Sequence, residues 1–246
     1  MCAATTITTQ KTSSEPLAPP VITIDGPSGT GKGTICQMIA RKLDWHYLDS
    51  GSLYRVLAYA ALQSQTNLDN EQELQALAND LPLKFRETDN IVRIVLGAED
   101  VSELIRSELC GNTASKIGVF PKVRQALLDR QRAFRQLPGL VTDGRDMGTV
   151  IFPDAQLKFF LLASTTERAE RRYRQLKKAG VHASLETILQ DLEQRDLRDK
   201  QRGVAPLKPA SDAIIIDNTE LSIEEVLHTM MKIIKETFST VSIHDR

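Results

Sequence analysis

The sequence has few cysteines, no long apolar run and almost no net charge, and each shortage excludes a class of protein. Its three cysteines, Cys2, Cys36 and Cys110, are widely spaced and form no CxxC pair, so the sequence predicts neither a disulfide framework nor a zinc site. No apolar run approaches the roughly 18 residues that a membrane span needs. The formal net charge of −1 argues against general electrostatic binding to nucleic acids or membranes. We therefore expect a cytoplasmic protein with no nucleic-acid or membrane partner, whose charges act locally.

The amino-terminal 20 residues are rich in Thr, Ser and Pro, and we expect residues 1–20 to form a disordered tail. They lack the charged start, apolar middle and small-residue cleavage site of a secretory signal, although their acid-poor composition leaves organelle targeting open. The remaining residues, 21–246, are long enough for a full core and short enough for one domain with an insertion.

A glycine-rich stretch, GPSGTGKGT, carries the main signal for function. It lies between an apolar run that predicts a buried strand and apolar residues at helical spacing that predict a helix. In that context its glycines permit a backbone that presents several N–H groups to one oxyanion, and the helix N-terminus adds partial positive charge. We predict a phosphate cradle with Lys32 on the β- and γ-phosphates, and an empty glycine-rich turn is the alternative. The predicted cradle comprises Gly26, Pro27, Ser28, Gly29, Thr30, Gly31, Lys32, Gly33 and Thr34.

Gly33 departs from the pattern G-x-x-x-x-G-K-[ST], because it stands where Ser or Thr would hold magnesium. Thr34 follows one residue late, so we expect no direct metal ligand from this stretch. The GKGT ending resembles small nucleotide kinases more than GTPases or motor ATPases.

Five short apolar segments alternate with helical patterns and predict a doubly wound parallel sheet with helices on both faces. The segments are residues 21–25, 45–48, 139–142, 157–162 and 213–217. We expect the last of them to be a buried strand. Because polar turns and the phosphate cradle follow these strands, we expect them to converge on the carboxyl edge of the sheet.

Two of these polar turns favour an anionic ligand. The turn DSGSLYR offers Ser50 and Arg55, for which a helix cap and a solvated arginine are the alternative. The turn DGRDMG surrounds Arg145 with two carboxylates, and a plain turn is its alternative. Further along the chain, Arg195, Asp199 and Arg202 share one helix face, although salt bridges within the helix explain part of that pattern.

Three arginines, Arg168, Arg171 and Arg172, also share a helix face. Like charges at this spacing destabilise an empty helix, and a polyphosphate beneath them would remove the repulsion. We therefore favour a mobile arginine lid over residues 168–182, with a solvated face as the alternative.

A predicted hairpin interrupts the alternation of strands and helices. The segments Leu83–Thr88 and Ile91–Leu96 flank Asp89-Asn90, a plausible two-residue turn. We therefore expect residues 70–118 to form an inserted subdomain.

Together, the motifs GPSGTGKGT, DSGSLYR, DGRDMGT and RDxRDxxR resemble the bacterial-type cytidylate kinase family over about residues 20–240. The first motif alone indicates some P-loop kinase, whereas the other three motifs and the insertion are more specific. The resemblance implies an α/β fold, namely a P-loop doubly wound five-stranded parallel sheet with a small β-containing CMP-binding insertion and a short arginine-rich lid. It also implies transfer of the γ-phosphoryl group of ATP to CMP or dCMP, giving CDP or dCDP, with magnesium arriving with ATP.

The resemblance further implies a role for each matching position. The residues that look like phosphate-side contacts to CMP are Ser50, Arg55, Arg145 and Arg202. The residues that resemble the cytosine-reading set are Ser115, Arg124 and Asp146, and the ribose-contacting pair is Arg195 and Asp199. The side chains expected to neutralise charge during catalysis are Lys32, Arg145, Arg171, Arg172 and Arg202. Asp143 is a weaker candidate, as an outer partner of magnesium or water.

Such a transfer depends on positioning and charge neutralisation and needs no general base, because the acceptor phosphate is already ionised near neutral pH.

A rival hypothesis is a kinase for AMP, UMP or a small alcohol. A rival of another class is an ATP-dependent regulatory or nucleic-acid-associated module, which Gly33 and the near-zero net charge argue against. We expect a monomer with ATP and CMP or dCMP as its substrates.

Overall fold

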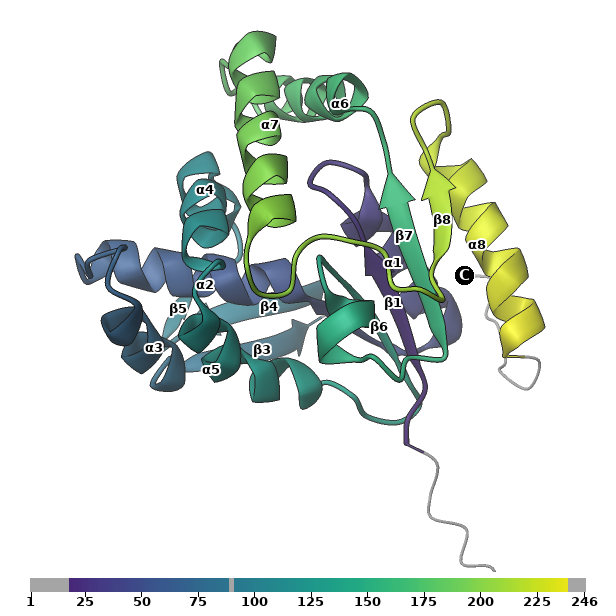
Figure 1. The fold of residues 1–246 in the computed structure, drawn as a ribbon, viewed down its shortest axis with the longest axis horizontal. Helices are drawn as coiled ribbons and strands as arrows, with labels where there is room; N and C mark the ends of the chain where they lie inside the picture. The colour runs from purple at the N-terminus through teal and green to yellow at the C-terminus, as the bar shows by residue number, and fades with distance from the viewer. Residues whose placement is uncertain (1–17, 89–90, 239–246) are drawn as a thin grey trace, which may run out of the picture.

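The computed structural model describes residues 18–88 and 91–238, and its centre is a parallel sheet (Figure 1). The strand order is β2-β6-β1-β7-β8, and every neighbouring pair is parallel. The strands are β1 (Val21–Asp25), β2 (His46–Asp49), β6 (Leu140–Gly144), β7 (Leu157–Leu162) and β8 (Ile214–Asp217). The prediction of a five-stranded parallel sheet is confirmed.

Helices cover both faces of this sheet. On one face, α1 (Lys32–Leu43) and α8 (Ile223–Thr237) pack on β1, β7 and β8 and form the largest apolar core. On the other face, the start of α2 (Ser50–Gln63) and a single π-helical turn, η2 (Met147–Ile151), bury apolar side chains against β1 and β6. The sheet is therefore doubly wound, as predicted.

The predicted insertion forms a separate layer with its own small antiparallel sheet beside α2 (Figure 1). Strands β3 (Leu83–Thr88) and β4 (Ile91–Leu96) pair as the predicted hairpin, while its turn, Asp89-Asn90, lies outside the described residues. The remaining elements of this layer are α3 (Glu71–Asn79), β5 (Glu99–Asp100), η1 (Leu104–Arg106), α4 (Glu108–Ile117) and α5 (Pro121–Arg132). The hairpin and α4 lie within the expected residues 70–118, whereas α5 packs in the same layer but lies beyond them.

Two helices lie beyond the carboxyl ends of the central strands (Figure 1). They are α6 (Thr165–Lys178) and α7 (Leu185–Gln201), and they pack on each other through a small cluster that includes Ala169, Ile188 and Leu192. This pair faces the carboxyl edge of the sheet, where the phosphate loop begins after β1.

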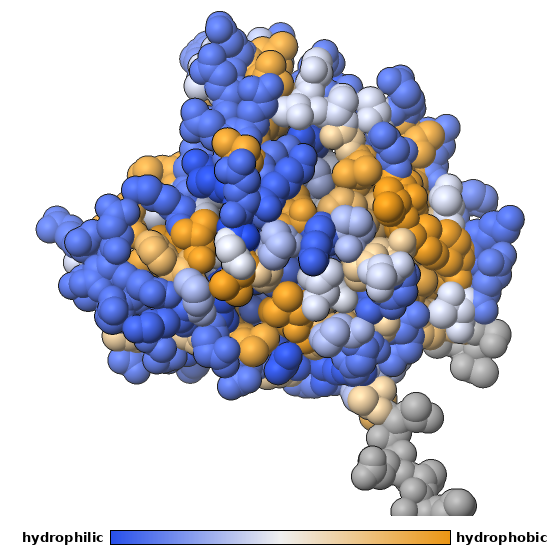
Figure 2. All heavy atoms as spheres, viewed as in Figure 1, coloured by the Kyte–Doolittle hydropathy of each residue, from blue (hydrophilic) through white to orange (hydrophobic). Residues whose placement is uncertain are grey.

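Strand β8 corrects one prediction, because it is not buried as expected. Ile214 and Ile215 are 37% and 56% exposed, and Ile216 is the one isoleucine of the strand that is buried. The physical reason is that β8 is the edge strand and has only β7 as a neighbour within the described sheet. Figure 2 shows the resulting apolar surface over the region of β7 and β8.

Two further expectations concern the termini and the membrane. Most of the predicted tail falls in residues 1–17, outside the described residues. Between residues 18 and 238, with 89–90 excepted, no helix is long and apolar enough to cross a membrane.

Candidate active site

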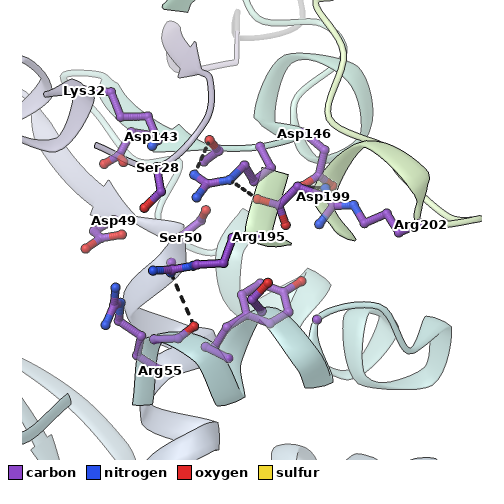
Figure 3. Close-up of a pocket in the computed structure, with 18 of the residues that line it drawn as sticks. Ser28, Lys32, Asp49, Ser50, Arg55, Asp143, Asp146, Arg195, Asp199 and Arg202 are labelled. Carbon is purple, nitrogen blue, oxygen red and sulfur yellow. Dashed lines mark hydrogen bonds and ion pairs between the residues drawn. The ribbon is translucent and has the colours of Figure 1, made fainter. Parts of the chain in front are cut away.

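A cavity of about 190 Å³ lies at the carboxyl edge of the central sheet, between the phosphate loop, α4 and α7 (Figure 3). The predicted site residues that line it are Ser28, Lys32, Ser50, Arg55, Ser115, Arg124, Arg145, Asp146, Arg195, Asp199 and Arg202. Figure 3 shows Lys32 and Asp49 towards one side, Asp146 and Arg202 towards the other, and Arg195 and Asp199 between them. The volume is below the roughly 300–1,000 Å³ of most ligand sites, because charged side chains from opposite walls pair across it.

The phosphate loop has the backbone that the glycines were predicted to allow. Gly26, Gly29 and Gly31 have φ of 151°, 83° and 83°, a region that favours glycine. A Cβ at Gly26 would lie 2.3 Å from the backbone oxygen of Leu161 on β7. The first residue of the loop must therefore be a glycine. Gly31 caps α1 without a side-chain hydrogen bond, which leaves the first-turn N–H groups of the helix available to an anion.

Lys32 is buried beside two carboxylates. Its Nζ donates to the backbone oxygen of Pro27 at 2.9 Å. Burial and the positive charge of Arg145 hold the pKa of Lys32 below its ordinary 10.5, against the opposing effect of Asp143 and Asp49. The pKa of Asp143 is raised, first by burial and then by the charge of Asp49. This end of the cavity therefore holds an amino group and two carboxyl groups close together.

Arginine–aspartate pairs dominate the rest of the cavity. Arg145 Nε donates to Asp199 Oδ2 at 2.7 Å, and the Arg145 guanidinium lowers the pKa of Asp199 although burial opposes ionisation. Asp146 accepts from Arg124 through one carboxylate oxygen and from Arg202 at 3.3 Å through the other. Both oxygens of the Asp146 carboxylate are thus fixed by guanidinium groups.

Two further arginines carry charge that no carboxylate within the described residues neutralises at salt-bridge distance. Arg55 Nη1 donates to the backbone oxygen of Ile105 at 3.0 Å, and Arg195 Nη2 to that of Gly111 at 3.3 Å. The Nε of Arg195 is buried and has no partner among the described residues. Burial, followed by the charges of Arg55 and Arg145, lowers the pKa of Arg195 to about 10. Charge of one sign held together in this way favours an anionic ligand.

The side of the cavity formed by α2, α4 and α5 is suited to a planar polar group. Arg124 lies with its guanidinium carbon 5.7 Å from the centre of the Tyr54 ring, and it also donates to the backbone oxygen of Gly118 at 3.3 Å. Ser115 lines the cavity, and its hydroxyl accepts from Arg198 Nε at 3.2 Å. The three residues predicted to read cytosine therefore share one cavity, although they come from α4, α5 and the turn after β6.

The comparisons with known proteins decide the family. A family model described as cytidylate kinase matches residues 22–236. The chain belongs to the cytidylate kinase family. Among curated relatives, a cytidylate kinase of Aeromonas hydrophila is 55% identical over 227 residues, which cover 92% of this chain and 99% of that protein. A cytidylate kinase of Pseudomonas putida is 58% identical over 211 residues, covering 85% of this chain and 92% of that protein.

In this cytidylate kinase family member, Arg168 differs from the expected lid arginine because its side chain is only 3% exposed. Its guanidinium pairs with both carboxylate oxygens of Asp196 on α7, at 3.2 and 2.6 Å, and donates to the backbone oxygen of Ser28 at 2.9 Å. The buried pair links the phosphate loop to α6 and α7. The expected repulsion on the helix is therefore relieved at this position by an aspartate and not by a ligand.

Arg171 and Arg172 do not line the cavity in this conformation. Arg171 donates to Glu167 at 2.8 Å and to the backbone oxygen of Asn218 at 2.7 Å. Arg172 Nε donates at 2.7 Å to Glu108, the first residue of α4. The catalytic role assigned to both arginines stays a prediction, and it requires that they leave these partners.

Three polar residues in or beside the site were not singled out from the sequence. Asp49 and Tyr54 line the cavity, and both lie inside the DSGSLYR motif, which is the signal that could have found them. Asp25 contacts the turn after β6 through its buried carboxylate. Its position directly before the first glycine of the loop was visible, but its contact depends on the pairing of β1 with β6.

We predict that replacing Arg168 destabilises the fold far more than replacing a neighbouring arginine on α6. Arg168→Ala would leave the Asp196 carboxylate unpaired in a mostly buried position, and the free energy of unfolding should fall by about 3–5 kcal/mol. Arg174→Ala is the matched control, since its side chain is 60% exposed, and it should change that free energy by about 0.5 kcal/mol or less. Urea unfolding of both variants measures the difference, and equal effects would contradict a structural role for Arg168.

Proposed function

We propose that the protein transfers the γ-phosphoryl group of ATP to CMP or dCMP, giving CDP or dCDP. The observation that carries the proposal is the shared cavity, in which Lys32 of the phosphate loop faces the same space as Arg145, Asp146 and Arg202. Membership of the cytidylate kinase family supports it. Two nucleotides entering this space from its two sides would bring their phosphates together beside Lys32.

On the acceptor side, the proposal assigns the CMP phosphate to Ser50, Arg55, Arg145 and Arg202. Six cationic and four acidic side chains line the cavity, so a phosphate with about two negative charges would bring it close to neutrality. Arg145 does not have to leave Asp199 to take part, because a guanidinium has donors beyond the Nε that this aspartate uses. The phosphate would therefore complete a network that is already in place.

The base and sugar of the acceptor are assigned to the remaining cavity residues. Asp146 and Ser115 would accept from the exocyclic amine of cytosine, and Arg124 would donate to the ring acceptors. Both of the Asp146 oxygens are already oriented by arginines, which supports a reader of fixed geometry. Arg195 and Asp199 are proposed to contact the ribose.

On the donor side, the phosphates of ATP are proposed to lie on the loop from Gly26 to Thr34 and on the N-terminus of α1. Lys32 would neutralise the β- and γ-phosphates. Residues 168–182 would act as the lid, with Arg171 and Arg172 moving onto the transferring phosphoryl group. Closure of such a lid would exclude water, which would otherwise hydrolyse ATP.

Magnesium fits the acidic end of the cavity as an ion that arrives with ATP. A Cβ built at Gly33 would lie 3.6 Å from the Tyr47 hydroxyl and 4.0 Å from both carboxylate oxygens of Asp143, so a carboxylate faces the space where other phosphate loops place a hydroxyl. The charge of Asp49 raises the pKa of Asp143, after the larger effect of burial, and a divalent cation would offset that charge. Since Mg²⁺ usually keeps several waters, these two carboxylates would hold it through them. The bound ion supplies further neutralisation of phosphate charge.

Catalysis in this proposal rests on placement and on charge. The arginines and Lys32 hold donor and acceptor phosphates in line and offset the negative charge that gathers between them. No side chain needs to remove a proton, because the attacking phosphate oxygen is ionised near neutral pH.

We further propose that the protein is a monomer, since elements of one chain complete the cavity. We also propose a cytoplasmic location, which the free buried thiols of Cys36 and Cys110 support.

The direct test is a phosphorylation assay with ATP and one acceptor at a time, at equal concentrations of CMP, dCMP, UMP and AMP. We expect turnover of CMP and dCMP, negligible turnover of AMP, and no transfer by Lys32→Ala with its fold largely retained. The variant's fold is checked by its thermal unfolding. Strong AMP turnover with negligible CMP turnover would contradict the proposed acceptor, and CMP turnover by Lys32→Ala would contradict the role of the lysine.

The pH dependence of ATP use should report the lowered pKa of Lys32. With CMP saturating, kcat/KM for ATP should decline on the alkaline side around a pKa below 10.5, because deprotonation removes the charge that attracts the phosphates. Lys32→Arg keeps its charge throughout this range, so its profile should lack the decline even if its activity is lower. A profile of the native protein that stays flat up to pH 10.5, or the same decline in both proteins, would contradict the assignment.

A further inference from the structure

Asp25 ends β1 immediately before the phosphate loop, yet its side chain serves a different part of the site. Its carboxylate accepts from the backbone N–H of Met147 at 2.9 Å and of Gly148 at 2.8 Å. The residue is 4% exposed and does not line the cavity. Strand pairing aligns Asp25 with Gly144 of β6, which brings the carboxylate under the turn that carries Arg145 and Asp146.

The bonded N–H groups belong to the first turn of η2, and such groups have no partner within their own helix. An aspartate at the N-cap position normally accepts, with its own side chain, from the N–H of the second or third helical residue, and Gly148 is the second residue of η2. Asp146 occupies that position, but among the described residues its side chain makes no cap hydrogen bond. Its oxygens instead face Arg124 and Arg202 in the cavity.

We propose that Asp25 is a positioning residue for base recognition, which caps η2 from the neighbouring strand and so leaves the carboxylate of Asp146 free to face the cavity. This inference rests on the proposed function, in which Asp146 reads the cytosine amine. Without Asp25, the N–H groups of Met147 and Gly148 would lose this acceptor, and Asp146 stands at the N-cap position, from which a side chain can accept from Gly148. Capping its own helix would turn Asp146 away from the nucleotide.

The electrostatics of Asp25 suit a role in substrate recognition better than a role in stability alone. Burial raises its pKa from 3.8 to about 6, despite the hydrogen bonds from Gly148 and Met147, and the charge of Asp146 adds to the rise. At pH 7.5 the group is therefore ionised and can accept through both oxygens. Because the pKa in the folded state lies above the ordinary value, the ionised form reduces folding stability at that pH. Removing the charge of Asp25 should therefore affect the folding stability and the KM for CMP differently.

A double-mutant cycle with Asp25→Asn, Asp146→Asn and the double variant tests the proposal at pH 7.5. Asparagine has nearly the same shape but retains only one acceptor oxygen at this site. KM for CMP in Asp25→Asn should rise on the order of 10-fold, while KM for ATP changes less than about twofold. The double variant should be no worse for CMP than Asp146→Asn, because Asp25 acts through Asp146. Thr23→Val is the matched control on β1: its buried hydroxyl has no partner among the described residues, and KM for CMP should not change.

Several results would overturn the inference. One is an unchanged KM for CMP in Asp25→Asn. Another is a double variant in which the effects of the two single substitutions on KM for CMP multiply. A third is an equal rise of KM for CMP and KM for ATP together with a lower melting temperature, which would mean a merely structural role. If Asp25→Asn does not fold, Asp25→Ser, which also offers a single acceptor, replaces it with the same expected split. If the native protein phosphorylates CMP and Asp25→Asn does so with the same KM, this inference alone is refuted. A native protein that does not phosphorylate CMP refutes the proposed function, and this inference with it.

Discussion

The rest of the structure depends on one interaction. At the carboxyl edge of the sheet, buried arginines and aspartates neutralise each other. Arg145 with Asp199, and Arg124 and Arg202 with Asp146, join side chains from three separate parts of the chain: α5, the turn after β6, and α7 with its C-cap residue. Charges buried singly would cost far more than such pairs. The pairs therefore hold the guanidinium groups in place before any nucleotide arrives, and a phosphate can add to donors that are already oriented.

Two buried charged residues outside the cavity fix the elements that carry these pairs. Arg168 connects the phosphate loop with α7, the helix that carries Arg195 and Asp199 and ends just before Arg202. Asp25 connects the end of β1 with the turn of Arg145 and Asp146. Both contacts start beside the loop assigned to ATP and end on an element assigned to CMP. The two proposed nucleotide sites would thus share one continuous framework.

The sequence was sufficient for the central sheet, the phosphate loop, the hairpin and most cavity residues, because each has a local signal of apolar spacing, glycine position or motif. It was not sufficient for Arg168, since an arginine facing solvent and one facing Asp196 have the same spacing along α6. It also missed the exposure of Ile214 and Ile215, because an edge strand and a central strand are equally apolar over a few residues. The contact of Asp25 depends on which strand lies beside β1, and no local pattern encodes that neighbour.

The central claim is that the arginines of the cavity bind a phosphate, and calorimetric titration with CMP and with cytidine tests it most directly. The two ligands share base and sugar, so the difference in their affinities isolates the contribution of the phosphate. We predict that CMP binds at least about 100-fold more tightly than cytidine, or about 2.7 kcal/mol. Equal affinities for the two ligands would contradict the account.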